Sequence, residues 1–204
     1  MDYITSSDLG TYAGATLGTV NLGNAALAIA AASRSVDEFC GRDFETGILT
    51  ASTMQVEVRS LWRAETPRDF YSTAGLVVAL DNDGDGTAET TLTTADYQLY
   101  PLNGYVVGVG TSSYYQIRLT SQAFQQCYNV RPVLHVTALW GWSAVPDVIK
   151  RATAMLALEM LKDPETPFGV IGVDNVGIMR LRANPRVANI LQPFVRPSRA
   201  AMVA

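Results

Sequence analysis

The sequence predicts an α+β fold: a small bundle of two main helices, an inserted antiparallel β unit and an extended C-terminal arm. Three observations lead to it. Apolar residues recur with helical spacing in residues 21–40 and 147–162. Between these segments apolar residues recur at about every second position, as in β-strands. Residues 175–204 contain arginine but no acidic residue. The expected domains are therefore a helical core (1–50 with 141–168), a β domain (51–140) and an arm (169–204).

The first main helix is expected at residues 21–40, where Ala25, Ile29, Val36 and Phe39 lie on one apolar stripe. Gly41 follows as a typical helix stop, because glycine readily adopts the left-handed conformation that ends many helices. The alanine content of the segment would let a second helix approach closely. Residues 6–20 are rich in Gly, Ser and Thr, which predicts a helical turn and a loop.

The β domain is expected to begin near residue 51, where Met54, Val56 and Val58 alternate with polar residues. The apolar run 76–80, the Asp/Asn/Gly turn 81–86 and the alternating segment 90–100 predict a hairpin. Residues 114–119 and 132–140 predict further strands, with turns at 101–104 and 108–113.

The second main helix is expected at residues 147–162, with Pro164 soon after it. Residues 169–181 read as extended. Asn184 and Pro185 can cap and start a short helix through Leu191, because proline is favoured in the first turn. Pro193 and Pro197 prevent the last segment from being helical throughout.

Two tryptophans flank a glycine where the last strand meets the second helix, in the order Trp140, Gly141, Trp142. Their large rigid rings are typical of buried packing and also of protein interfaces. Two interpretations stay open: the rings cover the core at the junction, or one of them faces a partner. Trp140, Trp142 and Phe194 are the candidate packing or interface aromatics.

The acidic turn holds Asp81, Asp83 and Asp85 at alternate positions before Gly86, which resembles the first half of a calcium-binding loop. An EF-hand would place a bidentate glutamate at the twelfth position, but Leu92 stands there and Glu89 falls at the ninth. The turn is either an acidic hairpin tip or a weak structural calcium site; no other cofactor is expected.

No catalytic residue can be named. His135 is the one histidine and lies in a strand-like segment, and the chain has neither a G-x-S-x-G elbow nor a phosphate-binding loop. Cys40 and Cys127 belong to no metal or redox motif and are interpreted as free thiols. Apolar stretches are too short to cross a membrane and no secretory signal is visible, so synthesis and use in the cytoplasm are expected.

Charge is unevenly distributed: residues 1–146 carry a net charge of -7 and residues 147–204 carry +3. Arginines without neighbouring acids suit carboxylates or phosphates on a partner, although a solvated basic tail is the alternative. The candidate partner-binding residues are Arg180, Arg182, Arg186, Arg196 and Arg199.

Four segments in this order resemble the head-to-tail connector (neck) adaptor proteins of long-tailed bacteriophages: helix end 36–44, hairpin 81–101, junction 140–146, and 167–170 followed by 180–181. The form with a β insertion is similar to that of phages of actinobacteria. The resemblance implies a non-enzymatic virion protein at the capsid vertex, present in the host cytoplasm before assembly. It implies a homo-oligomeric ring, commonly of about twelve copies, that docks on the portal protein and binds the next neck (stopper) or tail protein.

In such a ring DNA passes through the channel without sequence-specific binding, no membrane is involved, and the C-terminal segment reaches the portal and neighbouring subunits. Truncation after Leu181 is accordingly expected to abolish portal binding and leave the core folded. The alternative function is a calcium-dependent β-type module that binds carbohydrate or mediates adhesion, with exposed aromatic rings stacking on the ligand.

Overall fold

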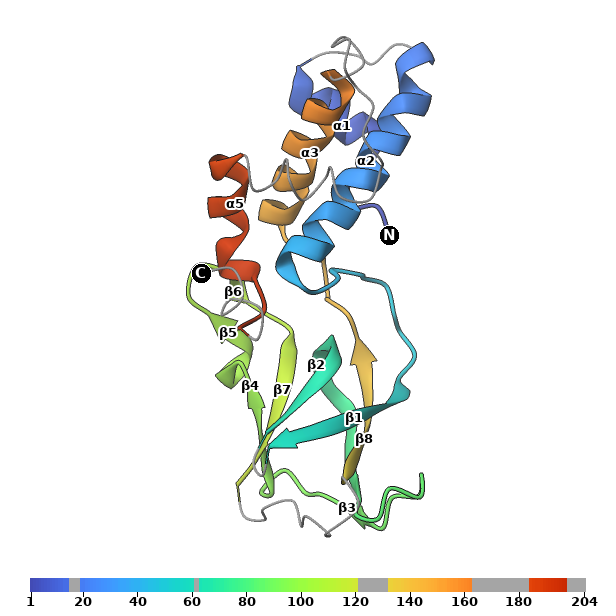
Figure 1. Cartoon of the computed structure of the whole chain (residues 1–204), viewed down its shortest axis with the longest axis vertical. Coiled ribbons are helices and arrows are strands. Elements are labelled where there is room, and N and C mark those ends of the chain that lie inside the picture. The colour runs from blue at the N-terminus through green and yellow to red at the C-terminus, as the bar shows by residue number, and fades with distance from the viewer. Residues whose placement is uncertain (15–18, 61–62, 121–131, 163–183, 198–204) are drawn as a thin grey trace. The chain divides into compact units, whose positions relative to one another are not determined.

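The computed structural model describes residues 1–14, 19–60, 63–120, 132–162 and 184–197 of the chain. Two compact units are present: Met1–Phe44 with Val145–Ala204, and Glu45–Ala144. The first contains helices and the second contains the β-sheet, so the fold is mixed α+β (Figure 1). Among the described residues, none of the helices is long and apolar enough to cross a membrane.

The helical unit is built on α2 (Thr19–Cys40) and α3 (Asp147–Lys162), which lie side by side as the sequence predicts (Figure 1). Their close approach follows from small side chains, because Ala25, Ala32, Ala152 and Ala157 are all fully buried. The short helix α1 (Ser6–Ala13) contacts both, and α5 (Pro185–Leu191) packs on α3.

Local sequence signals set the ends of these helices. Thr5 caps α1 in a capping box with Asp8, an arrangement that satisfies free N–H groups at a helix start. At the end of α2, Gly41 has φ 66° and its N–H donates to the carbonyl of Asp37 at 2.8 Å. The glycine stop predicted from the sequence is therefore confirmed.

The described C-terminal residues 184–197 are not an extended arm. Asn184 caps α5 through hydrogen bonds from the N–H groups of Arg186 and Val187, and the short helix predicted at this cap is confirmed. A 3-10 turn, η3 (Gln192–Phe194), follows. The chain folds back because its apolar side chains are buried in the helical unit; these are Val187, Leu191, Phe194 and Val195.

The β unit is an antiparallel sheet in the order β1-β8-β2-β7-β4, with β3 paired to β2 outside this path (Figure 1). Its strands are β1 (Ser52–Ser60), β2 (Arg63–Asp81), β3 (Thr90–Thr91), β4 (Tyr97–Tyr100), β7 (Tyr114–Leu119) and β8 (Val133–Trp140). The 3-10 turn η1 (Leu102–Gly104) precedes a small separate hairpin of β5 (Tyr105–Val106) and β6 (Gly110–Thr111). One core lies within the unit, formed by residues such as Val56, Phe70, Ile117, Leu134 and Trp140.

Two strand predictions need correction. The run 76–80 is only the end of the 19-residue β2, whose register shifts and positive-φ Gly75 obscure the period-two pattern. Residues 90–100 do not form one hairpin arm, since Thr90 and Thr91 pair with β2 whereas β4 pairs with β7. The strand is interrupted because the Asp96 carboxylate accepts hydrogen bonds from the N–H and hydroxyl of Thr93.

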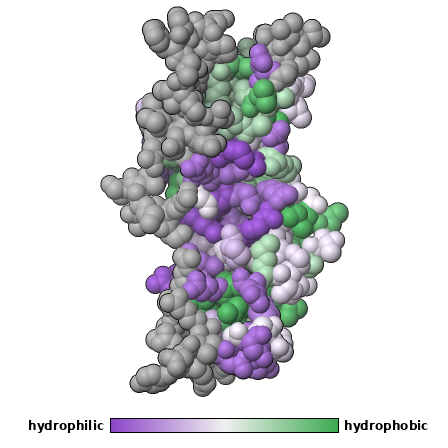
Figure 2. Space-filling view, turned by 45° about the vertical axis from the view of Figure 1, so that its right-hand side comes forward, coloured by the Kyte–Doolittle hydropathy of each residue, from purple (hydrophilic) through white to green (hydrophobic). Residues whose placement is uncertain are grey.

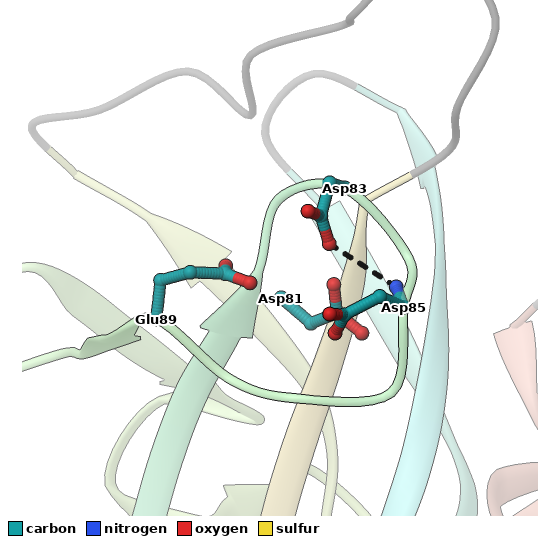
Figure 3. Close-up of side chains that lie close together, drawn as sticks. All are labelled: Asp81, Asp83, Asp85 and Glu89. Atoms are coloured by element: carbon teal, nitrogen blue, oxygen red, sulfur yellow. Dashed lines mark hydrogen bonds between the residues drawn. The ribbon is translucent and has the colours of Figure 1, made fainter.

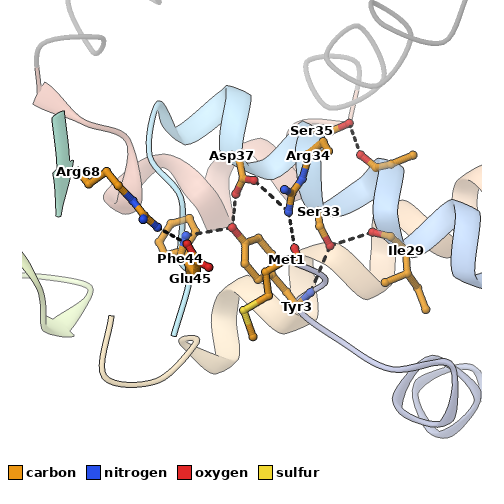
Figure 4. Close-up of polar contacts among 11 residues, drawn as sticks. Met1, Tyr3, Ile29, Ser33, Arg34, Ser35, Asp37, Phe44, Glu45 and Arg68 are labelled. Atoms are coloured by element: carbon orange, nitrogen blue, oxygen red, sulfur yellow. Dashed lines mark hydrogen bonds and ion pairs between the residues drawn. The ribbon is translucent and has the colours of Figure 1, made fainter. Parts of the chain in front are cut away.

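The N-terminal segment is tied to α2 by polar contacts around Tyr3 (Figure 4). The Tyr3 hydroxyl donates to the Asp37 carboxylate and accepts from the N–H of Phe44 at 2.9 Å. The Arg34 guanidinium lies 3.3 Å from the Asp37 carboxylate and donates to the carbonyl of Met1. Burial raises the pKa of Asp37 to about 6, although the bonds from Tyr3 and Arg34 oppose the shift.

Asp37 therefore makes stability depend on pH. Because the folded pKa lies above the unfolded value of about 4, the folded state binds the extra proton, and stability falls as pH rises from about 4 to 6. The uncharged variant Asp37→Asn should be more stable relative to wild type at pH 7.5 than at pH 4, by about 1 kcal/mol after discounting for partial exposure. Urea unfolding of both proteins across this range measures the difference. A pH-independent difference would contradict the assignment.

Candidate partner-binding site

The Trp140 side chain is enclosed in the β unit, with 1% of its surface exposed. The indole N–H donates to the carbonyl of Ser52 at 2.8 Å, and the ring meets Phe70 edge-on with centroids 5.9 Å apart. A buried indole needs such a partner for its N–H, and the β1–β8 pairing supplies it. In this chain the ring is packed within the sheet and does not face solvent.

Trp142 and Gly141 hydrogen-bond to two other segments of the β unit just after β8 ends. The Trp142 indole N–H donates to the Asp69 carboxylate at 3.1 Å, and its backbone N–H donates to the carbonyl of Glu45 at 2.8 Å. The Gly141 N–H donates to the carbonyl of Asp69 at 2.6 Å. At φ 94° Gly141 is in a conformation that favours glycine, and a Cβ there would collide with the carbonyl oxygen of Glu45.

Phe194 lies in the interior of the helical unit. Its ring meets Phe44 edge-on at 6.0 Å, and Phe44 in turn meets Tyr3 at 5.8 Å. This aromatic row joins η3 to the segment after α2 and to the N-terminal segment. All three candidate aromatics are thus buried in the isolated chain.

Of the five candidate arginines, Arg180, Arg182 and Arg199 lie outside the described residues. Arg196 is half-buried: its Nε is enclosed and its backbone N–H donates to the carbonyl of Cys40 at 2.9 Å. Arg186 is exposed in the first turn of α5. A cation there is unfavourable to the helix dipole, so this position does not stabilise α5 and leaves the guanidinium for other contacts.

The net negative charge of the chain comes from the β unit. Residues 45–144 carry a net charge of -4, which equals that of the whole chain, whereas the residues of the helical unit balance to zero. Much of this charge lies in the turn after β2. The β unit would therefore repel an anionic polymer more strongly than the helical unit would.

Four carboxylates converge in this turn: those of Asp81, Asp83, Asp85 and Glu89 (Figure 3). One ligand oxygen from each lies within 4.8 Å of the others. Glu89, at the ninth position of the loop, completes the set that the sequence predicted only in part. Hard cations such as calcium favour oxygen ligands of this kind.

Asp81 is covered by its own loop and is 1% exposed. Its oxygens accept hydrogen bonds from the N–H groups of Gly84 at 2.6 Å and Gly86 at 2.9 Å. Loss of water around the carboxylate raises its pKa, but these bonds and the nearby His135 outweigh that effect, so the pKa is lowered. Sequence reasoning named His135 but missed its contact with Asp81 at 3.7 Å, because only the β2–β8 register brings the two residues together.

No family model matches the chain, and no curated protein matches it. Two similar solved structures come from GTA (gene transfer agent) particles. The neck of an empty particle, computed with C6 symmetry, is 16% identical with a TM-score of 0.45, covering 87% of this chain and 88% of that one. The neck of a native particle, computed with C12 symmetry, is 17% identical with a TM-score of 0.41, covering 93% and 86%.

Proposed function

We propose that this chain is a structural virion protein: a head-to-tail adaptor whose copies form a ring on the portal. The ring links the DNA-filled capsid to the next neck or tail protein and leaves a channel for DNA. The observation that carries the proposal is the chain's organisation, a helical unit made from both ends of the chain around an inserted β unit. This is the order of elements implied by the sequence resemblance to neck adaptors.

The charge distribution supports the same role. DNA must slide through such a channel, and clusters of basic residues would retain its phosphates. The net charge of -7 on residues 1–146 suits passage without binding. The acid-free segment after Asp174 supplies cations for a protein partner that presents carboxylates. The resemblance makes the portal that partner.

Arg186 provides a clean test of portal binding. Arg186→Glu reverses an exposed charge, and because an acidic residue is favourable in the first turn of a helix, the variant should fold at least as well as wild type. We expect binding to purified portal to weaken by about tenfold, corresponding to about 1.4 kcal/mol for one lost charge contact. Surface plasmon resonance with immobilised portal measures the change.

Arg151→Glu is the matched control, since Arg151 is an exposed arginine of α3 outside the C-terminal segment. Its portal affinity should stay within twofold of wild type, about 0.4 kcal/mol. Equal loss in both variants would indicate general electrostatics and reject the specific contact. Unchanged binding of Arg186→Glu would remove Arg186 from the interface.

The carboxylate cluster favours the second candidate function, a calcium-dependent β-type binding module. That function requires the loop to take up calcium and the β unit to respond. Isothermal calorimetry with calcium, together with thermal unfolding in calcium and in chelator, distinguishes this calcium-dependent module from the structural adaptor. Saturable heat and a higher melting temperature in calcium would support the module, whereas neither effect would remove its main support.

A further inference from the structure

Two long segments of the chain contain no charged residue: residues 9–33 and residues 97–117. The first includes most of α1 and the first part of α2 in the helical unit. The second includes β4 and the β5–β6 hairpin in the β unit. Each unit therefore carries one uncharged tract in a protein that is 17% charged. Each tract also exposes large apolar side chains.

The β5–β6 hairpin is firmly built. Its strands pair Tyr105 with Thr111, and the N–H of Ser112 donates to the carbonyl of Gly104 at 2.8 Å. Gly104 has φ 60°, and a Cβ there would lie 3.2 Å from the hydroxyl of Tyr114, so the backbone passes close to β7. The hairpin is thus anchored at its base.

The hairpin and the η1 turn that precedes it expose three apolar side chains, and these three define the hairpin tip. Leu102 in η1 is 51% exposed, Tyr105 in β5 61% and Val107 in the turn after β5 86%. Val107 lies within the turn closed by the bond from the N–H of Val109 to the carbonyl of Val106 at 3.1 Å, a place where polar residues, glycine and proline normally predominate. Valine at this position does not stabilise the turn. Figure 2 shows hydrophobic groups, in green, scattered among hydrophilic ones on the face in view.

A second uncharged surface with an exposed apolar side chain lies on α2 around Leu27, which is 72% exposed. Asn24, Leu27, Ala31 and Arg34 recur at spacings of three and four, so they share one face of the helix. Arg34 is the first charged residue along this face from its N-terminal side among the described side chains. The face before it is uncharged, with small residues beside one large apolar side chain.

We propose that the hairpin tip of one copy, formed by Leu102, Tyr105 and Val107, docks on the α2 face around Leu27 of the next copy. The two surfaces differ, so the contact is head-to-tail and generates a ring when the rotation closes. Neither surface carries a charge that docking would leave buried and unpaired. The proposal deepens the proposed ring and rests on it for the presence of neighbouring copies.

The size of the surfaces favours a neighbour within an assembly over an isolated pair. Three partly exposed side chains supply far less than the roughly 800 Å² per partner that a stable interface normally buries. One such contact is weak, but contacts repeated around a closed ring reinforce one another. A symmetric tip-to-tip pair would leave the α2 face uncovered.

Cysteine cross-linking tests the contact. The full chain carrying Leu27→Cys and Val107→Cys is treated with a short bis-maleimide at high protein concentration and run on a denaturing gel. We expect a ladder of cross-linked oligomers, because each copy is joined to two different neighbours. Each single variant alone should stay monomeric, and a mixture of the two should give dimers only.

Control variants distinguish cross-links formed by specific docking from those formed by random collision. Wild type sets the background from Cys40 and Cys127. The pair Leu27→Cys with Leu49→Cys is matched, since Leu49 is 84% exposed but lies outside both uncharged tracts. Its cross-linked fraction should be about tenfold lower, because docking raises the effective concentration of the correct pair. Adding Tyr105→Asp to the Leu27→Cys/Val107→Cys protein should reduce its ladder to the control level.

Three outcomes overturn the proposal. No ladder in the Leu27→Cys/Val107→Cys protein rejects the contact, dimers of Val107→Cys alone show a tip-to-tip pair, and an equal ladder in the Leu49 control shows random collision. Failure here is distinct from failure of the proposed function. Portal binding without the ladder would reject only this contact, whereas a ladder without portal binding would keep the contact and reject the adaptor role.

Discussion

Replacing Gly141 with alanine is expected to destabilise the β unit by about 2–6 kcal/mol, since an unfavourable positive φ and a steric clash each cost about 1–3 kcal/mol. Gly141 has φ 94°, and the new Cβ would collide with the carbonyl oxygen of Glu45. The same carbonyl accepts the N–H of Trp142, so relieving the clash would break that bond. Chemical unfolding followed by tryptophan fluorescence measures the loss.

Gly75→Ala is the control for Gly141→Ala. Gly75 also has positive φ, at 70°, but its Cβ would meet nothing within 4 Å. We expect a loss of only about 1 kcal/mol, the cost of the backbone conformation alone. Equal losses in the two variants would show that Glu45 does not approach Gly141 closely in solution.

Phe194→Ala is expected to destabilise the helical unit by about 3–5 kcal/mol, the usual cost of truncating a buried phenylalanine. The ring is 2% exposed and packs against Phe44, so the truncation leaves a cavity at the point where η3 meets the segment after α2. Urea unfolding followed by circular dichroism gives the free energy. The neighbouring exposed Gln192 offers the control, and Gln192→Ala should change stability by less than about 0.5 kcal/mol.

A small effect of Phe194→Ala would mean that the C-terminal segment is detached in solution, as an independent arm would be. The burial of Val187, Leu191 and Phe194 predicts otherwise. It also revises the truncation experiment: ending the chain after Leu181 removes these core residues and should unfold the helical unit. A charge change at Arg186 probes the partner contact without that loss.

The sequence was sufficient to predict both main helices, because each has a long apolar stripe and a local stop or start signal such as Gly41. The cap at Asn184 was equally predictable, since capping depends on a few adjacent residues. The sheet was less predictable. The long strand β2 changes register twice beside β8, and such shifts depend on contacts with distant strands.

The candidate site likewise has features that the sequence predicts and features that it does not. Alternation of Asp81, Asp83 and Asp85 marked the acidic loop, but its contact with His135 depends on pairing between β2 and β8. The tryptophans were recognised as important, yet composition could not tell burial from exposure. Their enclosure follows from hydrogen bonds to Ser52 and Asp69, which are remote in sequence. The exposed hairpin tip was missed because its segment read as turns.

The most direct test of the adaptor role is electron microscopy of the purified full chain mixed with the candidate portal protein. We expect a ring of this chain stacked on the portal, coaxial with it and open along the DNA channel. Portal particles that remain bare while the chain stays monomeric beside them would contradict it. Binding of single copies without a ring would contradict it equally.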